Sequence, residues 1–264
     1  MKKFIATSLA AIAACATVGF ASCGQKDTLI VYTEAGFPPW EFTRPGSTAV
    51  VGVDMEIAKY IADKYDWELQ IINGSFDTIV AGIEEDNALG IAGISYSEER
   101  AADVEFSDFY WGDAYQAVVY STDSNPTLTE GKFAASNFDG AKLVYQTGTT
   151  SQITVSDNQA DWGVASTGSF SQVMAALEEM TTATNKTYLI VDSQVAAQLV
   201  AENTGISYAA IEGVEAEQYG VVAKKGNTAL IEKVNAALEE LLEKDANGKN
   251  QIEKWFVEYS ADAE

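Results

Sequence analysis

The sequence predicts an α/β protein made of two similar units, each with a parallel sheet that helices cover. Short apolar segments alternate with segments of helical periodicity between residues 28 and 94, and the alternation returns between residues 142 and 225. A strand, helix, strand order of this kind is typical of parallel sheets. No Pro- or Ser-rich segment separates the two series, so we expect strands, not a flexible tether, to join the units.

The first unit is predicted to have three strands and two helices. The apolar segments "TLIVYTEA" (28–35), "WELQII" (67–72) and "ALGIAGI" (88–94) are the expected strands. Between them, "GVDMEIAKYIADKY" (52–65) and "SFDTIVAGIEED" (75–86) carry apolar residues at helical spacing.

The second unit repeats this order. Its strands are expected at residues 142–146, 187–192 and 218–225. Its helices are expected at residues 169–180, starting at Ser169, at 193–205 and, as a pair broken near Gly248, at 228–260.

Residues 1–23 are predicted to be a lipoprotein signal peptide. Lys2 and Lys3 form a basic start, and an apolar segment spans residues 4–20. The sequence "ASCG" that follows resembles the box in which the cysteine, here Cys23, is diacylated and becomes the mature N-terminus.

Two alternatives stay open for this segment: an ordinary secretory peptide, or a box that ends at Cys15 and leaves a very short apolar region. In each case we expect the mature chain outside the cytoplasm. A single lipidated cysteine leaves no thiol pair for a disulfide. No later segment approaches the roughly 20 apolar residues of a membrane span, so we expect membrane contact only through the lipid anchor.

The composition excludes several classes of function. With 16 basic and 39 acidic residues the net charge is −23, which argues against binding nucleic acid, whose phosphates need basic surfaces. The sequence contains no histidine, so catalysis by Ser-His or Cys-His pairs and metal binding through histidine are excluded. We expect no metal and no cofactor.

An arginine follows the third strand of the first unit. The chain has only two arginines, and Arg100 ends the polar stretch "GISYSEER", which begins at Gly93 and contains Ser95. The carboxyl ends of strands in open α/β sheets bind ligands, and a guanidinium suits two-point contact with a carboxylate. The alternative is a surface arginine that pairs with a neighbouring acidic residue.

Two further motifs lie at strand ends. "QTGTTS" (146–151) follows a strand and opens a helix, so its N–H groups suit a small anion, although the stretch lacks the lysine of a nucleotide-binding loop. Asp192 ends a buried strand, where it caps the next helix or pairs with an ammonium group. Aromatic residues such as Phe37 and Phe76 either pack on a domain edge or form a flat platform for a ligand.

These segments, taken in order, resemble the polar-amino-acid-binding proteins of ABC importers. The resemblance covers residues 28–259 and rests on seven segments: "YTEAGFPPWEF", "GVDMEIAKYIA", "GSFDTIVAGI", "AGISYSEERAADVEFSDFYW", "LVYQTGTTS", "LIVDSQVAAQLV" and "EQYGVVAKKGN". It implies a two-lobed, type II periplasmic-binding-protein-like fold with two hinge strands, near residues 111–120 and 218–223. Lobe 1 would comprise residues 24–112 plus 220–264, and lobe 2 residues 113–219.

The resemblance also implies a set of ligand contacts. The α-carboxylate would be held by Arg100 and the backbone amides of Thr149 and Thr150. The α-ammonium would be held by Asp192, the Gly93 carbonyl and the Ser95 hydroxyl. Phe37 and Phe76 would lie beside the side chain of the ligand, and Glu34 and Gln146 near its far end. A zwitterion taken from water needs both charges met by opposite charge and hydrogen bonds, which agrees with this set.

The function implied is that of a monomeric lipoprotein that passes an amino acid to a membrane ABC permease by closure of the lobes. Glu34 and Gln146 favour a side chain with N–H donors, such as glutamine or a cationic residue, whereas Phe37 and Phe76 equally accept an apolar one. The alternatives are an enzyme on the same fold, dehydratase-like or transglycosylase-like, with Glu34 as the acid or base, or a ligand-sensing module.

Overall fold

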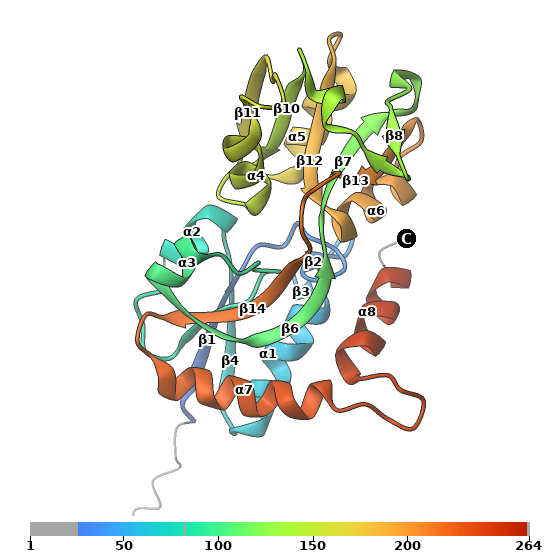
Figure 1. The fold of residues 1–264 in the computed structure, drawn as a ribbon. Helices are drawn as coiled ribbons and strands as arrows, with labels where there is room; N and C mark the ends of the chain where they lie inside the picture. Colours follow the sequence, from blue (N-terminus) through green and yellow to red (C-terminus); the bar gives the residue numbers. More distant parts are fainter. Residues whose placement is uncertain (1–25, 82, 263–264) are drawn as a thin grey trace, which may run out of the picture.

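The computed structural model describes residues 26–81 and 83–262, so the signal segment with Cys23 lies outside the described residues. It contains two five-stranded sheets, which form two lobes that lie one above the other in Figure 1. This mixed α/β, two-lobed architecture confirms the predicted fold class. None of the helices in the described part is long and apolar enough to span a bilayer.

The sheet of lobe 1 has the strand order β4-β1-β5-β14-β6. Its strands are β1 (Thr28–Thr33), β4 (Glu68–Asn73), β5 (Ala88–Gly90), β6 (Val104–Ala114) and β14 (Glu217–Lys224). Strand β1 pairs in parallel with β4 and β5, and β14 pairs antiparallel with β5 and β6. A short hairpin of β2 (Phe42–Thr43) and β3 (Val50–Val51) precedes the first helix.

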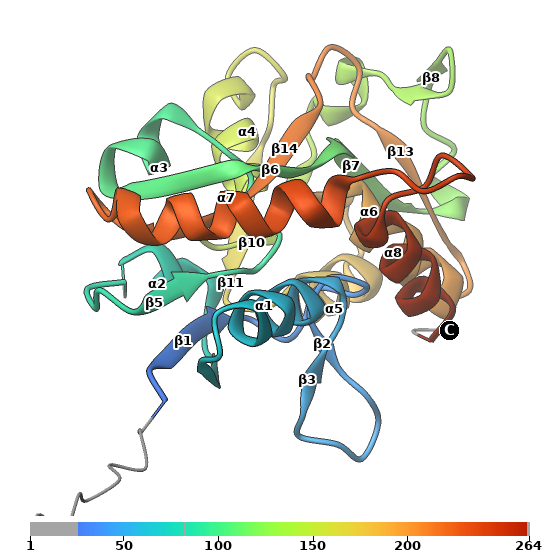
Figure 2. The ribbon, with the colours of Figure 1, turned by 90° about the horizontal axis from the view of Figure 1, so that it is seen from below.

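Helices cover both faces of this sheet because its side chains alternate between two cores. Leu29 and Val31 of β1 face the main core, whereas Ile30 and Tyr32 face the smaller one. The main core lies under α1 (Val53–Lys64), α7 (Thr228–Leu242) and α8 (Gln251–Asp262), which pack against one another (Figure 2). The smaller core contains Ile79 of α2 (Phe76–Ala81), and α3 (Glu98–Asp103) packs against α2.

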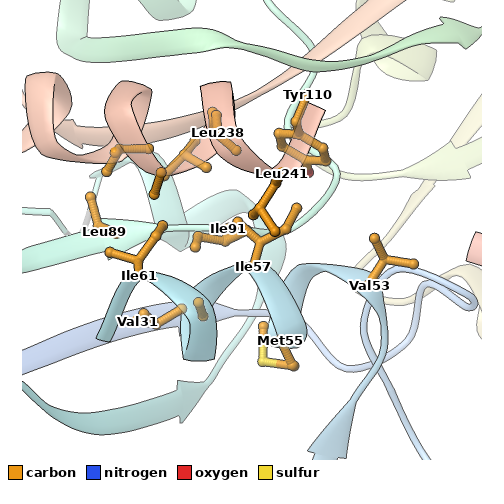
Figure 3. Close-up of a cluster of buried hydrophobic side chains, with 14 of the residues drawn as sticks. Val31, Val53, Met55, Ile57, Ile61, Leu89, Ile91, Tyr110, Leu238 and Leu241 are labelled. Atoms are coloured by element: carbon orange, nitrogen blue, oxygen red, sulfur yellow. The ribbon is translucent and has the colours of Figure 1, made fainter. Parts of the chain in front are cut away.

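Figure 3 shows the main core at the point where α1 meets α7 and the sheet. Ile57 and Ile61 lie on one face of α1, at the helical spacing of four residues, and both are fully buried. Leu238 and Leu241 of α7 point toward them. Burying a side chain of this size stabilises the fold by about 1.5–3 kcal/mol, so this packing holds the C-terminal helices on lobe 1.

The sheet of lobe 2 has the order β11-β10-β12-β7-β13. Its strands are β7 (Gln116–Ser121), β10 (Lys142–Gln146), β11 (Ser166–Phe170), β12 (Thr187–Asp192) and β13 (Ile206–Ala210). Strand β10 is parallel to β11 and β12, whereas β7 runs antiparallel to β12 and β13. The helices are α4 (Thr150–Asn158), α5 (Val173–Thr182) and α6 (Ser193–Glu202), and a small hairpin of β8 (Leu128–Thr129) and β9 (Lys132–Phe133) completes the lobe.

The chain passes between the two sheets at two adjacent places. Only Tyr115 separates β6 from β7, and residues 211–216 connect β13 to β14. Glu217 pairs with Ala114, so the two crossings run side by side. The second crossing precedes residues 218–223, the range expected from the sequence, because those residues belong to β14 in lobe 1. The lobe borders given above stay predictions.

The prediction of a helix that starts at Ser169 is wrong. Ser169 belongs to β11, and α5 begins at Val173. The segment "STGSF" lacks the apolar alternation of a buried strand, since β11 is the edge strand of its sheet and is ordered by its pairing with β10. Strand β13 also has no counterpart among the predicted strands.

Candidate binding site

One pocket between the lobes gathers nearly all the residues that the sequence singled out. The free space inside it is small, about 30 Å³. Nine of the ten predicted residues line it: Phe37, Phe76, Gly93, Ser95, Arg100, Gln146, Thr149, Thr150 and Asp192. The tenth, Glu34, is buried behind them and accepts a hydrogen bond from Gln146 Nε2 at 3.2 Å.

The Arg100 side chain is buried in this pocket, with 7% of its surface exposed. Its Nη1 donates to the Ser95 carbonyl at 2.7 Å, and its Nη2 donates to the Gly148 carbonyl of the other lobe at 2.9 Å. The guanidinium also lies over the Phe76 ring, 5.4 Å from its centroid. Within the described part of the chain no carboxylate forms an ion pair with Arg100, so the alternative of a surface ion pair is excluded.

Burying a guanidinium without an anionic partner costs free energy, because the charge loses its water. Burial accordingly lowers the pKa of Arg100, while the negative charges of Glu217 and Glu99 act in the opposite direction. Arg100 stays protonated nonetheless, and a bound anion would supply the missing partner. The side chain is therefore built to receive an anion from the pocket.

Asp192 carries the complementary charge on the lobe 2 side. It caps α6, where its Oδ1 accepts from the Gln194 N–H at 2.8 Å. Its Oδ2 is buried and has no hydrogen-bond partner among the described residues, and the same holds for the buried hydroxyl of Tyr219. Asp192 thus caps the helix with one oxygen and leaves the other available for a donor in the pocket.

The environment of Asp192 disfavours its charge until a cation arrives. Burial is the main cause that raises its pKa to about 7, and Glu217 adds to the increase. The Gln194 N–H and the nearby Tyr219 hydroxyl lower the pKa, although the hydroxyl falls short of a direct hydrogen bond. An ammonium group bound to Oδ2 would reverse this shift.

Gly93 occupies a position that only glycine fits well. Its φ is +52°, and a Cβ added there would lie 2.8 Å from Cε1 of Phe37. Its N–H donates to Oδ2 of Asp54 at 2.7 Å, and that carboxylate is fully buried at the start of α1. Asp54 therefore holds the turn at Gly93, which brings the Phe37 ring against the backbone.

The start of α4 faces the same pocket. Thr149 is the N-cap, and its hydroxyl accepts from the Gln152 N–H at 3.4 Å. The first N–H groups of a helix have no partner within the helix and carry its positive dipole end. Thr150 and Ser151 of this first turn line the pocket, so the helix start can serve an anion beside Arg100.

Sequence reasoning missed several residues of the pocket. Five lining residues were not predicted: Gln116, Ser151, Val173, Ile190 and Val191. Glu217 was also missed, although its carboxylate contacts three lining residues. No local pattern marks Gln116 or Glu217, because the pairing of the two crossings brings them to the pocket.

Comparison with known proteins places this architecture in one class, the two-lobed solute-binding proteins. Residues 29–258 match the bacterial extracellular solute-binding proteins, family 3, and the chain belongs to this family. The arginine-binding extracellular protein ArtP of Bacillus subtilis is 25% identical over 97% of this chain and 99% of its own length. Other matched proteins are named for histidine and glutamine.

Solved structures agree with this assignment. Holo ArgBP from T. maritima is 31% identical, with a TM-score of 0.73 over 87% of this chain and 96% of that one. An ancestral arginine-binding protein bound to arginine is 30% identical, with a TM-score of 0.76 over 89% of this chain and 98% of that one.

Proposed function

We propose that this protein binds an amino acid outside the cytoplasm and delivers it to an ABC importer by closure of the two lobes. One observation carries the proposal. A single buried pocket contains a guanidinium without an anionic partner, Arg100, and a carboxylate oxygen without a donor, Oδ2 of Asp192. A zwitterionic amino acid meets both needs at once. Binding of an intact zwitterion needs no catalysis, so we infer that the protein is not an enzyme.

The opposite charges come from different lobes, which supports the closure mechanism. Arg100 lies on α3 of lobe 1, and Asp192 lies at the end of β12 in lobe 2. A ligand that bridges them binds the closed form better than the open form, and this difference in affinity drives closure. Existing contacts across the cleft, from Arg100 to Gly148 and from Gln146 to Glu34, show how closely the lobes approach.

For the side chain of the ligand we propose a cationic one, with L-arginine as the first candidate. The protein groups in and behind the pocket are mostly acidic: Asp192, Glu217 and Glu34 face a single positive charge on Arg100. A zwitterion with a neutral side chain would leave this excess uncompensated. The relatives that are named for arginine also support a cationic side chain on the ligand. Anchoring through a lipidated Cys23, and a monomeric state, belong to the same proposal.

A thermal-shift screen of the chain from Lys26 onward against the twenty L-amino acids tests the proposal. A ligand at a hundred times its dissociation constant stabilises the folded state by about 2.7 kcal/mol, and we expect L-arginine to give the largest shift. The α-amidated and α-deaminated forms of the best ligand serve as controls, because each lacks one charge of the zwitterion. Absence of a shift with all twenty amino acids would contradict the proposal.

If the lobes close on the ligand, a larger residue at Gly148 should weaken binding. This glycine has φ +78°, and an added Cβ would lie 2.9 Å from both Cα and Cβ of Asp77 in the opposite lobe. We expect Gly148→Ala to weaken L-arginine binding by about 1–3 kcal/mol, because the methyl group keeps the lobes apart. Gly140→Ala is the matched control, since Gly140 has φ +69° and nothing within 4 Å of an added Cβ. Equal affinities of the two variants in calorimetry would contradict this view of closure.

A further inference from the structure

Glu217 at the hinge connects the lobes through three hydrogen bonds. It is the first residue of β14 and pairs with Ala114, at the point where both crossings meet. Its Oε2 accepts from the Ser95 hydroxyl and, at 2.9 Å, from the Thr150 hydroxyl. Its Oε1 accepts from Gln116 Nε2 at 2.9 Å. All three donors line the pocket, and they come from both lobes.

The direction of each hydrogen bond in this network is fixed by the contact between Gln116 and Ser151. Gln116 Oε1 accepts from the Ser151 hydroxyl at 2.6 Å, so the amide must present its N–H groups to Glu217 and to the Thr150 oxygen, which lies 3.2 Å away. Thr150 therefore receives a hydrogen bond from Gln116 and gives its own proton to Glu217. The carboxylate at the centre of the network can only accept.

The network limits what the Ser95 and Thr150 hydroxyls can offer to a ligand. A serine or threonine hydroxyl has one proton and two lone pairs, and here both protons are used by Glu217. What Ser95 still offers to the pocket is a lone pair, which accepts from an N–H group and repels an anion. The α-carboxylate of a ligand is then left to Arg100 and the N–H groups at the start of α4.

We propose that Glu217 is a positioning residue that orients the Ser95 hydroxyl to accept from the α-ammonium group of the ligand and, through Thr150, holds lobe 2 against lobe 1. The inference rests on the proposed function for its ligand. It assigns to the hinge a role in recognition as well as in motion. The negative charge of Glu217 acts in the same sense, because it raises the local preference for a cation beside Asp192.

The experiment compares Glu217→Gln with the wild-type chain. The amide has one acceptor oxygen where the carboxylate has two. When its NH₂ group takes the place of Oε2, it faces the Ser95 and Thr150 hydroxyls, and the Ser95 proton turns toward the pocket. We expect the affinity for L-arginine to fall about tenfold or more in calorimetry. The affinity for 5-guanidinopentanoic acid, which is arginine without its α-amino group, should change much less. If the screen selects another amino acid, that amino acid and its deaminated form take their place.

Two controls separate positioning from general damage to the hinge. Glu215→Gln removes a negative charge from the same crossing at an exposed side chain and should leave both affinities unchanged. In a Ser95→Ala background, Glu217→Gln should cost less affinity than in the wild-type chain, because the hydroxyl that it orients is gone and only its link to Thr150 remains to be lost. Equal losses for the two ligands, or full additivity of the two substitutions, would overturn the proposal.

The contact of Glu217 with Thr150, which links the lobes, can be tested without a ligand. Small-angle scattering of the ligand-free chain should give a larger radius of gyration for Glu217→Gln than for Glu215→Gln. An unchanged radius of gyration would contradict the proposal that Glu217 holds the lobes together. If the wild-type chain binds none of the twenty amino acids, the proposed function fails, and this scattering comparison alone decides whether Glu217 holds the lobes together.

Discussion

Arg100→Ala is expected to abolish most of the affinity for L-arginine, at a cost of about 2–5 kcal/mol. The substitution leaves a desolvated α-carboxylate without its charged partner, and it also removes the bond to the Gly148 carbonyl across the cleft. Arg100→Lys keeps the charge but loses the two-point geometry, so we expect an intermediate loss. Isothermal titration calorimetry measures both variants.

The chain supplies its own control for this prediction. Arg44 is the other arginine of the chain; it is exposed, and its guanidinium lies 5.8 Å from the centroid of the Tyr259 ring. Arg44→Ala removes the same charge from a place outside the pocket, so the affinity should stay at the wild-type value. Comparable losses at both positions would show that long-range charge, and not the contact, governs binding.

Asp192→Asn is expected to cause a loss of similar size, because the α-ammonium group loses its charged acceptor. Asparagine is also a good N-cap, so the start of α6 should be preserved and the variant should fold. Circular dichroism checks the fold, and calorimetry with L-arginine checks the affinity. Affinity within about twofold of wild type would sink the assignment of Asp192 to the ammonium group.

The pH dependence of binding gives Asp192 a distinct signature. Its pKa in the ligand-free pocket is about 7, and an ammonium group binds the ionised form. Below pH 7 the carboxyl must first release a proton, so the affinity should fall by about tenfold per pH unit, whereas above pH 7 it should be flat. Calorimetry at pH 6 in buffers of different ionisation enthalpy should detect the released proton.

The raised pKa of Asp192 has the opposite effect on the stability of the ligand-free protein: stability falls as the pH rises. The folded state holds the Asp192 proton more tightly than an unfolded chain does, because burial raises the pKa of this carboxyl from its ordinary value near 3.8 to about 7. The ligand-free protein should therefore lose stability as the pH rises from about 4 to 7, and bound ligand should remove this loss. Two other buried carboxylates lie near the pocket, Glu34 and Asp54, and burial raises the pKa of Glu34 and brings that of Asp54 to about 6. If Asp192→Asn keeps the pH step in affinity, one of these two groups is its cause.

Much of the fold and of the pocket could be predicted because its signals are local. Buried strands such as β10 and β12 read as short apolar runs, and the predicted bounds 142–146 and 187–192 match the observed ones. Since ligand groups in such sheets lie at strand ends, the polar residues after these runs, among them Gln146 and Asp192, are candidates from the sequence, and the family resemblance implies their ligand roles. The same reasoning found Gly93 and Ser95 after the third strand of lobe 1.

The residues that escaped prediction depend on pairing between distant parts of the chain. Glu217 reaches the pocket only because β14 aligns with β6 at Ala114. Edge strands such as β11 carry no apolar alternation, so nothing in the local sequence distinguishes them from a loop or a helix start. The two oxygens of Asp192 illustrate a third limit: the sequence presents the helix cap and the ammonium contact as alternatives, whereas one oxygen caps the helix and the other stays available.

The position of β14 in its sheet also bears on the order in which the lobes fold. This strand lies between β5 and β6, although it comes from residues 217–224, near the end of the chain. The sheet of lobe 1 therefore stays incomplete until residues 217–224 are available, whereas all five strands of lobe 2 come from one continuous stretch from β7 to β13. Late, long-range pairing makes lobe 1 the slower unit, so lobe 2 is ready to fold while lobe 1 still lacks a central strand.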